Sequence, residues 1–195
     1  QGSLTYNGLQ VKEINHHDLM KQITLVEHNP YIFAGTVRSN LLDGNCYASD
    51  EQLMAVLEKV NLLNYFKELD GLDSEIEERG NNLSGGQKQR LSIARALLHD
   101  SGVYIFDEAT SNIDIESEEI IMQVIEAMKK DKIVSLISHR LANVVNCKCN
   151  YVFSHGKLIG NGSHDQLMQE NQEYHQLVKT QQEIENYGGK TSEKA

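Results

Sequence analysis

The chain has 195 residues, of which 39% are hydrophobic, and it carries a formal net charge of −10. This length and composition suit a globular domain with a proper core, while the negative charge argues against a surface that binds nucleic acid. No apolar run approaches the length of a membrane span, and the three cysteines do not make a disulfide framework, so a reducing compartment fits best.

The first third of the chain alternates between short strands and helices. Residues 1–7 and 22–26 are predicted to be strands, and Asn7-Gly8 is a strong turn signal after the first of them. Ser49 begins a capping-box pattern, so a helix is expected over the apolar positions of residues 53–60. A second helical piece is expected at residues 62–69.

The most informative stretch runs from residue 83 to residue 114 and has three parts. A polar turn, Leu83-Ser84-Gly85-Gly86-Gln87, is followed by a run whose apolar residues have helical spacing: Leu91, Ala94, Leu97 and Leu98. A short apolar run then ends abruptly in Asp107-Glu108. Because that run does not alternate, we expect a strand that is buried on both faces within a parallel sheet.

The residue types in this stretch predict phosphate and metal chemistry. Adjacent glycines at a helix start let backbone N–H groups approach an anion, and Ser84 adds either a hydroxyl donor or an N-cap. Asp107 is a hard oxygen ligand suited to Mg²⁺, and Glu108 could orient an attacking water or accept its proton. His139 follows a second apolar run, residues 133–137, and could reach the same edge of the sheet.

The remainder of the chain is predicted to be structural. A helix with one apolar face at Ile121, Val124, Ile125 and Met128 precedes the second apolar run, and another helix is expected after His139. Strands at residues 150–153 and 157–160 flank a turn, and a single C-terminal helix is expected to follow Gly162-Ser163. His155, His164 and His175 are interpreted as surface residues, and Cys147 and Cys149 as thiols rather than half of a metal site.

Three motifs together resemble those of ATP-binding cassette (ABC) proteins. LSGGQ, residues 83–87, resembles the signature motif; YIFDEATSNID, residues 104–114, resembles the Walker B strand, catalytic Glu and D-loop; ISHR, residues 137–140, resembles the switch-His strand. Residues 31–41 are similar to the exporter pattern F-x-G-T-[IV]-R-x-N-[IL]. The resemblance covers roughly residues 2–186.

The resemblance implies an α/β fold of the P-loop NTPase type. A mostly parallel sheet flanked by helices would carry an all-helical ABC subdomain at about residues 36–90. Residues 1–186 would form one partial nucleotide-binding domain, and residues 187–195 a flexible tail. The phosphate-loop pattern G-x-x-x-x-G-K-[ST] is absent, because Gly189-Lys190-Thr191 matches only its last three positions. We therefore expect the first (Walker A) strand, loop and helix to be missing.

The resemblance also implies ATP hydrolysis that drives export across a membrane, with two cassettes enclosing two ATP molecules. Asp107 would hold Mg²⁺, Glu108 would polarise the water and His139 would steady the γ-phosphate. The nucleotide-binding residues implied by the resemblance are Ser84, Gly85, Gly86 and Gln87, Asp114 of the D-loop, and His28, which replaces the family's Q-loop Gln. The implied partners are a second nucleotide-binding domain and a transmembrane domain, at the cytoplasmic face of the cell membrane.

Two alternatives stay open beside that interpretation. Without a phosphate loop the chain itself would neither bind ATP tightly nor hydrolyse it, and would act only as a dimerisation or docking module. An uncovered apolar sheet surface would then favour self-association. A soluble ABC protein of DNA repair or translation fits less well, because those carry long coiled-coil inserts or twin cassettes.

Overall fold

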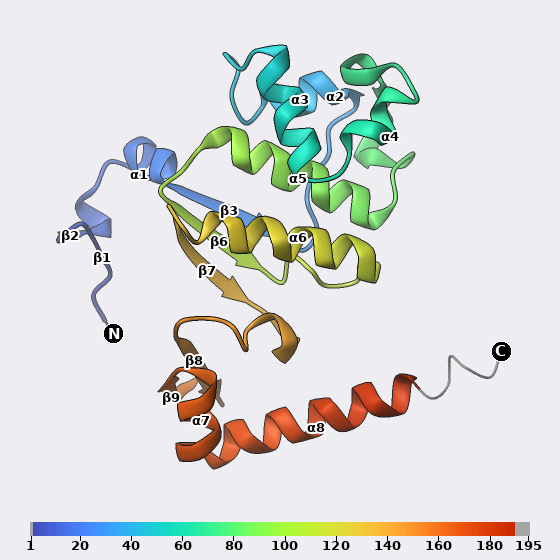
Figure 1. The fold of residues 1–195 in the computed structure, drawn as a ribbon. Coiled ribbons are helices and arrows are strands. Elements are labelled where there is room, and N and C mark those ends of the chain that lie inside the picture. The colour runs from blue at the N-terminus through green and yellow to red at the C-terminus, as the bar shows by residue number, and fades with distance from the viewer. Residues whose placement is uncertain (1, 190–195) are drawn as a thin grey trace. The chain divides into compact units, whose positions relative to one another are not determined.

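The structure is a computed structural model that describes residues 2–189, and the side chains of residues 2–183 (Figure 1). The chain divides into two compact units, residues 1–137 and residues 138–195, and each is described by itself. The prediction of one partial domain over residues 1–186 stays a prediction.

The chain begins with a small hairpin. Strands β1 (Thr5–Tyr6) and β2 (Leu9–Gln10) pair antiparallel, shorter than the strand expected over residues 1–7. Asn7 and Gly8 both have positive φ, 49° and 82°, as a two-residue hairpin turn requires, so the predicted turn is confirmed. Helix α1 (His16–Gln22) follows. It was not predicted, and the side chain of Asn15 caps it by accepting a hydrogen bond from the N–H of His17.

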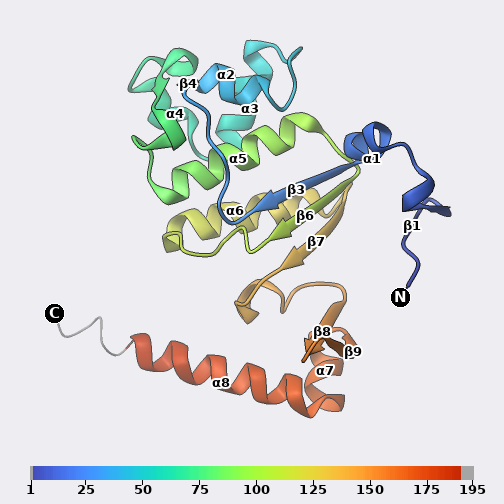
Figure 2. The same cartoon turned by 180° about the vertical axis from the view of Figure 1, so that it is seen from behind.

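A three-stranded parallel sheet forms the centre of the first unit. Its order is β3 (Ile23–Glu27), β6 (Val103–Asp107) and β7 (Ile133–Ile137). Helix α5 (Gly85–His99) leads into β6, and α6 (Ile115–Met128) leads into β7. Both helices lie on the same face of the sheet, which Figure 2 shows from the opposite side. The expected parallel α/β architecture is confirmed.

The two faces of this sheet differ in burial. On the face under the helices, Val26, Tyr104 and Phe106 are at most 2% exposed. On the other face, Leu25 is 54% exposed and Ile133 is 66% exposed. On the central strand itself, Val103 and Ile105 of this face are only half-buried, so the prediction that this strand is buried on both faces is wrong for one face, because α5 and α6 cover the same side.

The segment between β3 and α5 is mainly helical. It contains α2 (Val37–Leu42), α3 (Asp50–Lys59) and α4 (Leu63–Lys67), with a two-stranded ladder of β4 (Gly35–Thr36) and β5 (Glu75–Ile76). The predicted capping box at Ser49 is confirmed, since its hydroxyl accepts from the N–H of Gln52 and the Gln52 side chain accepts from the N–H of Ser49. The buried face of α3 belongs to the same core as the sheet.

The second unit has its own small core. Strands β8 (Asn150–Ser154) and β9 (Lys157–Gly162) pair antiparallel, and α7 (His164–Glu170) and α8 (Gln172–Gly189) follow. The core residues are Val152, Leu167, Tyr174 and Val178.

Three expectations for the second unit are corrected. The helix predicted after His139 is only a 3-10 turn, Leu141–Asn143. The single C-terminal helix is two helices, which meet at Asn171, where the backbone is extended. His164 is half-buried rather than a surface residue, because its Nδ1 lies 2.9 Å from the hydroxyl of Tyr174.

The predicted tail at residues 187–195 overlaps the end of α8, which runs to Gly189. Residues 190–195 lie outside the described residues, and so do Lys190 and Thr191 of the Gly-Lys-Thr match, so the flexible tail stays a prediction. Among residues 2–189, none of the helices combines the length and the apolar character needed to cross a membrane.

Candidate functional site

The polar turn at residues 83–87 forms the N-terminus of α5. The hydroxyl of Ser84 accepts a hydrogen bond of 3.1 Å from the N–H of Gln87, and the side-chain oxygen of Gln87 accepts one of 2.8 Å from the N–H of Ser84. Of the two roles considered for Ser84, the structure therefore shows the N-cap. The N–H groups of Gly85 and Gly86 precede the first intrahelical bonds, so this helix end is a concentration of backbone donors.

The two glycines of the turn have different surroundings. Gly85 is exposed, and a Cβ built there would meet only the carbonyl oxygen of Asn112, at 3.9 Å. Gly86 is buried, and a Cβ there would lie 2.1 Å from Oγ of Ser117 and 2.5 Å from Oδ2 of Asp114. Gly86 therefore allows α5 and α6 to meet at their N-termini, while Gly85 leaves an open approach to the helix end.

Asp114 lies at this meeting point, as the N-cap of α6. Its Oδ1 accepts a 2.8 Å hydrogen bond from the N–H of Ser117. That bond is the main reason why the pKa of Asp114 is below its usual value. The predicted D-loop residue and the predicted signature turn are thus brought together within one unit.

Arg90 reinforces this junction and was missed by sequence reasoning. From the second turn of α5 it donates hydrogen bonds to the carbonyl oxygens of Asn61 (2.9 Å) and Gly86 (3.4 Å). Burial lowers its pKa, and the nearby charges of Asp114 and Glu116 oppose that shift. The only feature of the sequence that could have indicated this role of Arg90 is its position one helical turn after Gly86.

The acidic pair lies at the carboxyl end of the central strand. Asp107 is the last residue of β6, half-buried, and pairs in register with Glu27 on one side and Ile137 on the other. Glu108 follows with φ of 51°, a conformation that few non-glycine residues adopt. Its N–H donates to the carbonyl oxygen of Ile137 (3.0 Å), and its own carbonyl oxygen accepts from the N–H of Ser111 (2.9 Å). The backbone at Glu108 is therefore fixed from both sides.

His28 reaches the same edge from the neighbouring strand. It directly follows Glu27, the register partner of Asp107, and its side chain is exposed. Gln89, another residue that sequence reasoning missed, links this edge to α5. Its side chain is 1% exposed and donates a 2.9 Å hydrogen bond to the carbonyl oxygen of Glu27. Nothing local in the sequence marks this contact, because the two residues are 62 positions apart.

His139 belongs to the second unit, whose first residue is Ser138. It is exposed, between Ser138 and Arg140, where the hydroxyl of Ser138 accepts a 3.0 Å hydrogen bond from the N–H of Arg140. Its joint action with the acidic pair stays a prediction from the sequence.

The side chains that could hold the implied Mg²⁺ are few. Within residues 2–189, no group of three or more His, Cys, Asp or Glu side chains is arranged to hold an ion. A single half-buried carboxylate such as Asp107 suits Mg²⁺, which is commonly held by one or two carboxylates together with phosphate oxygens and water. The residues present therefore fit a metal ion that arrives with a nucleotide.

The comparisons with known proteins agree with these motifs. Residues 1–111 match the family model described as ABC transporter. The chain is 47% identical over 185 residues to an "Uncharacterized ABC transporter ATP-binding protein" of Haemophilus influenzae, covering 95% of this chain and 33% of the relative. It is 38% identical over 183 residues to an "ATP-dependent lipid A-core flippase" of Legionella pneumophila, covering 93% of this chain and 31% of the relative.

A solved structure is similar throughout most of the fold. The "Structure of a bacterial Atm1-family ABC exporter with ATP bound" superposes with a TM-score of 0.86 at 28% sequence identity, over 93% of this chain and 32% of that chain. The present chain therefore spans about a third of the length of these relatives.

Proposed function

Because this chain belongs to the ABC transporter family, we propose that it is part of the nucleotide-binding domain of an exporter and that, in the whole protein, it couples ATP binding and hydrolysis to export. The observation that carries the proposal is the acidic pair at the carboxyl end of a central parallel strand, where open α/β sheets bind their ligands. Its partners would be a second nucleotide-binding domain and a transmembrane domain, at the cytoplasmic face of the cell membrane.

Asp107 and Glu108 would divide the chemistry at this edge. Asp107 would hold Mg²⁺ beside the phosphates, and the ion would offset the negative charge that develops during phosphoryl transfer. Glu108 would orient the attacking water and accept its proton. The two backbone hydrogen bonds at Glu108 support this role, because a fixed main chain restricts where the carboxylate can reach. His139 would donate a hydrogen bond to the γ-phosphate.

The N-terminus of α5 would serve the ATP of the opposite cassette. Ser84 accepts from the N–H of Gln87, which leaves its hydroxyl proton to donate to a phosphate oxygen. Gly85 would let that phosphate approach the backbone N–H groups closely, since almost nothing occupies the space at its Cβ position. Asp114 would lie at the boundary with the opposite cassette, and His28 would link the nucleotide to the transmembrane domain.

The test of this assignment is Glu108→Gln in the full-length protein. Loss of a general base is expected to reduce ATP turnover at least ~10²-fold while bound ATP is retained. Glu116→Gln is the matched control, because Glu116 is an exposed acid in the first turn of α6 and has no proposed contact with the water. Near wild-type turnover in Glu108→Gln would contradict the role of Glu108.

A second candidate function is a docking or dimerisation module that does not hydrolyse ATP. It is favoured by the exposed apolar face of the sheet. ATP turnover of the full-length protein separates the two, and titration calorimetry of the 195-residue chain with MgATP tests whether this chain alone binds the nucleotide. We expect no tight binding by this chain alone, and micromolar binding would contradict that expectation.

A further inference from the structure

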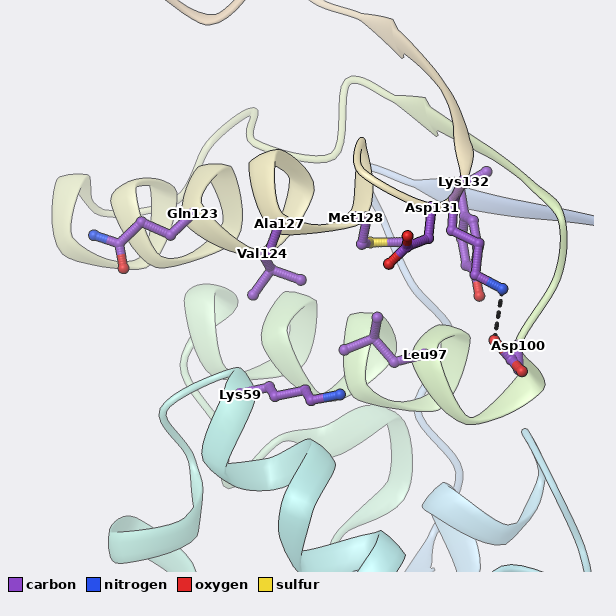
Figure 3. Close-up of a pocket in the computed structure, with 10 residues that line it drawn as sticks. Lys59, Leu97, Asp100, Gln123, Val124, Ala127, Met128, Asp131 and Lys132 are labelled. Carbon is purple, nitrogen blue, oxygen red and sulfur yellow. Dashed lines mark hydrogen bonds and ion pairs between the residues drawn. The ribbon is translucent and has the colours of Figure 1, made fainter.

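The first unit contains a pocket whose lining includes neither the acidic pair nor the residues of the signature turn. It has a volume of about 390 Å³ and lies between the C-terminal ends of α3 and α5 and the C-terminal half of α6 (Figure 3). Pockets that hold small organic ligands occupy about 300–1,000 Å³, so this one is at the small end of that range.

One wall of the pocket is apolar. Leu97 of α5 faces Val124 and Ala127 of α6, and Met128 continues this wall (Figure 3). The ring of Tyr104, 1% exposed, also lines the pocket, and its hydroxyl donates to the carbonyl oxygen of Ala96 at 3.3 Å. Since Tyr104 is almost fully buried and its hydroxyl already has a partner, it supports the wall from behind and offers little surface to a ligand.

The charged groups of the pocket are unequally neutralised. Lys132 is paired with Asp100 at 2.7 Å, and this hydrogen bond raises the pKa of Lys132. Asp131 also lies at that end of the pocket. Lys59, in the last turn of α3, extends along the pocket below Leu97, and among the described residues it has no acidic partner within 4.0 Å. Among the described residues Asp131 likewise has no basic partner within 4.0 Å, so the pocket combines an apolar wall with two unpaired charges, the Lys59 ammonium near Leu97 and the Asp131 carboxylate beside Lys132.

We propose that this pocket binds a small amphipathic carboxylate, whose acid group pairs with Lys59 and whose short apolar chain packs against Leu97, Val124 and Ala127. An ammonium that is already close to apolar surface gains a counterion without a large rearrangement, and the apolar chain removes the half-buried Leu97 and the exposed Ala127 from water. The proposal is independent of the nucleotide chemistry, because none of these residues belongs to the site described above.

The test is an NMR titration of the 195-residue chain with sodium octanoate. Octanoate is expected to shift the amide signals of Ala127 and Met128, and 1-octanol and octylammonium are expected to bind more weakly. Lys59→Gln is expected to weaken octanoate binding about three- to fivefold, the factor that a partly exposed ion pair contributes. Lys130→Gln, which removes the same charge from an exposed residue outside the pocket, is expected to change nothing.

A second variant tests the pocket by filling it, without removing a side chain on which folding depends. Ala127→Phe adds a ring from an exposed position on α6, so the helix can form while the ring occupies the pocket, and octanoate binding is expected to be lost. Equal affinities for octanoate and 1-octanol would overturn the proposal. So would tighter binding of octylammonium, which would assign the charged end to Asp131, or shifts confined to the exposed sheet face around Leu25.

Discussion

Replacing Gly86 by alanine tests the junction of α5 and α6 directly. The added Cβ would lie 2.1 Å from Oγ of Ser117 and 2.5 Å from Oδ2 of Asp114. To restore ordinary contact at 3.4 Å, the Ser117 hydroxyl must move by about 1.3 Å, and Asp114 must leave its capping position. Ser117 is 1% exposed, so its hydroxyl has little room to move, and the exposed side chain of Asp114 can turn into solvent only by giving up its hydrogen bond to the N–H of Ser117.

The expected loss of stability follows from two contributions. Losing the N-cap of α6 costs about 1 kcal/mol, and overpacking at a tight junction costs about 1–3 kcal/mol. Gly86→Ala should therefore lower the free energy of unfolding by about 2–4 kcal/mol. Gly85→Ala is the matched control, since a Cβ there meets only one atom, at 3.9 Å, and the substitution should be neutral or stabilise by up to about 1 kcal/mol.

Urea unfolding followed by far-UV circular dichroism measures the difference between the two variants. Hydrogen exchange of the Ser117 amide adds a local measurement, because that N–H donates to Asp114 in the native protein. Gly86→Ala should accelerate its exchange, and Gly85→Ala should not. Equal urea midpoints, or an unchanged Ser117 amide in Gly86→Ala, would refute the reasoning.

Two further predictions concern pH and association. The pKa of Asp114 is lowered in the folded state, so its contribution to stability is present above about pH 4 and is lost as the pH falls through the folded pKa. Asparagine caps a helix as well as aspartate does, so Asp114→Asn should have the same urea midpoint as the native chain at pH 7. Between pH 7 and pH 3 the variant should lose less stability than the native chain, and equal losses in the two proteins would contradict this. The exposed sheet face should promote self-association, so Leu25→Glu should lower the mass measured by light scattering, whereas Leu69→Glu, 56% exposed and outside that face, should not. A native chain that is already monomeric would rule out this association.

Short sequence patterns correctly predicted those helix starts and strands that depend on neighbouring residues alone. The capping box at Ser49 was visible as a four-residue pattern, and an N-cap was one of the two roles left open for Ser84; a helix begins at each of these residues. The strand that ends in Asp107 was also located to within a residue. Helix α1 was missed because HHDLMKQ has no clear apolar periodicity, and only Asn15 marks its start.

The errors share a different cause, which is contact between distant parts of the chain. Whether a sheet face is covered depends on which side the connecting helices take, and the residues of β6 alone do not specify that. Gln89 and Arg90 act on carbonyl groups far away in the sequence, Glu27 and Asn61. His164 likewise acquired a role only through Tyr174, which the fold brings beside it.

The positive φ of Glu108 bears on how this sequence could be redesigned. A left-handed backbone costs an ordinary L-residue about 1–2 kcal/mol, and glycine or asparagine tolerates it better. A design protocol that scored thermal robustness alone would therefore tend to place glycine at position 108. It would gain melting temperature by deleting the carboxylate that is proposed to orient the attacking water.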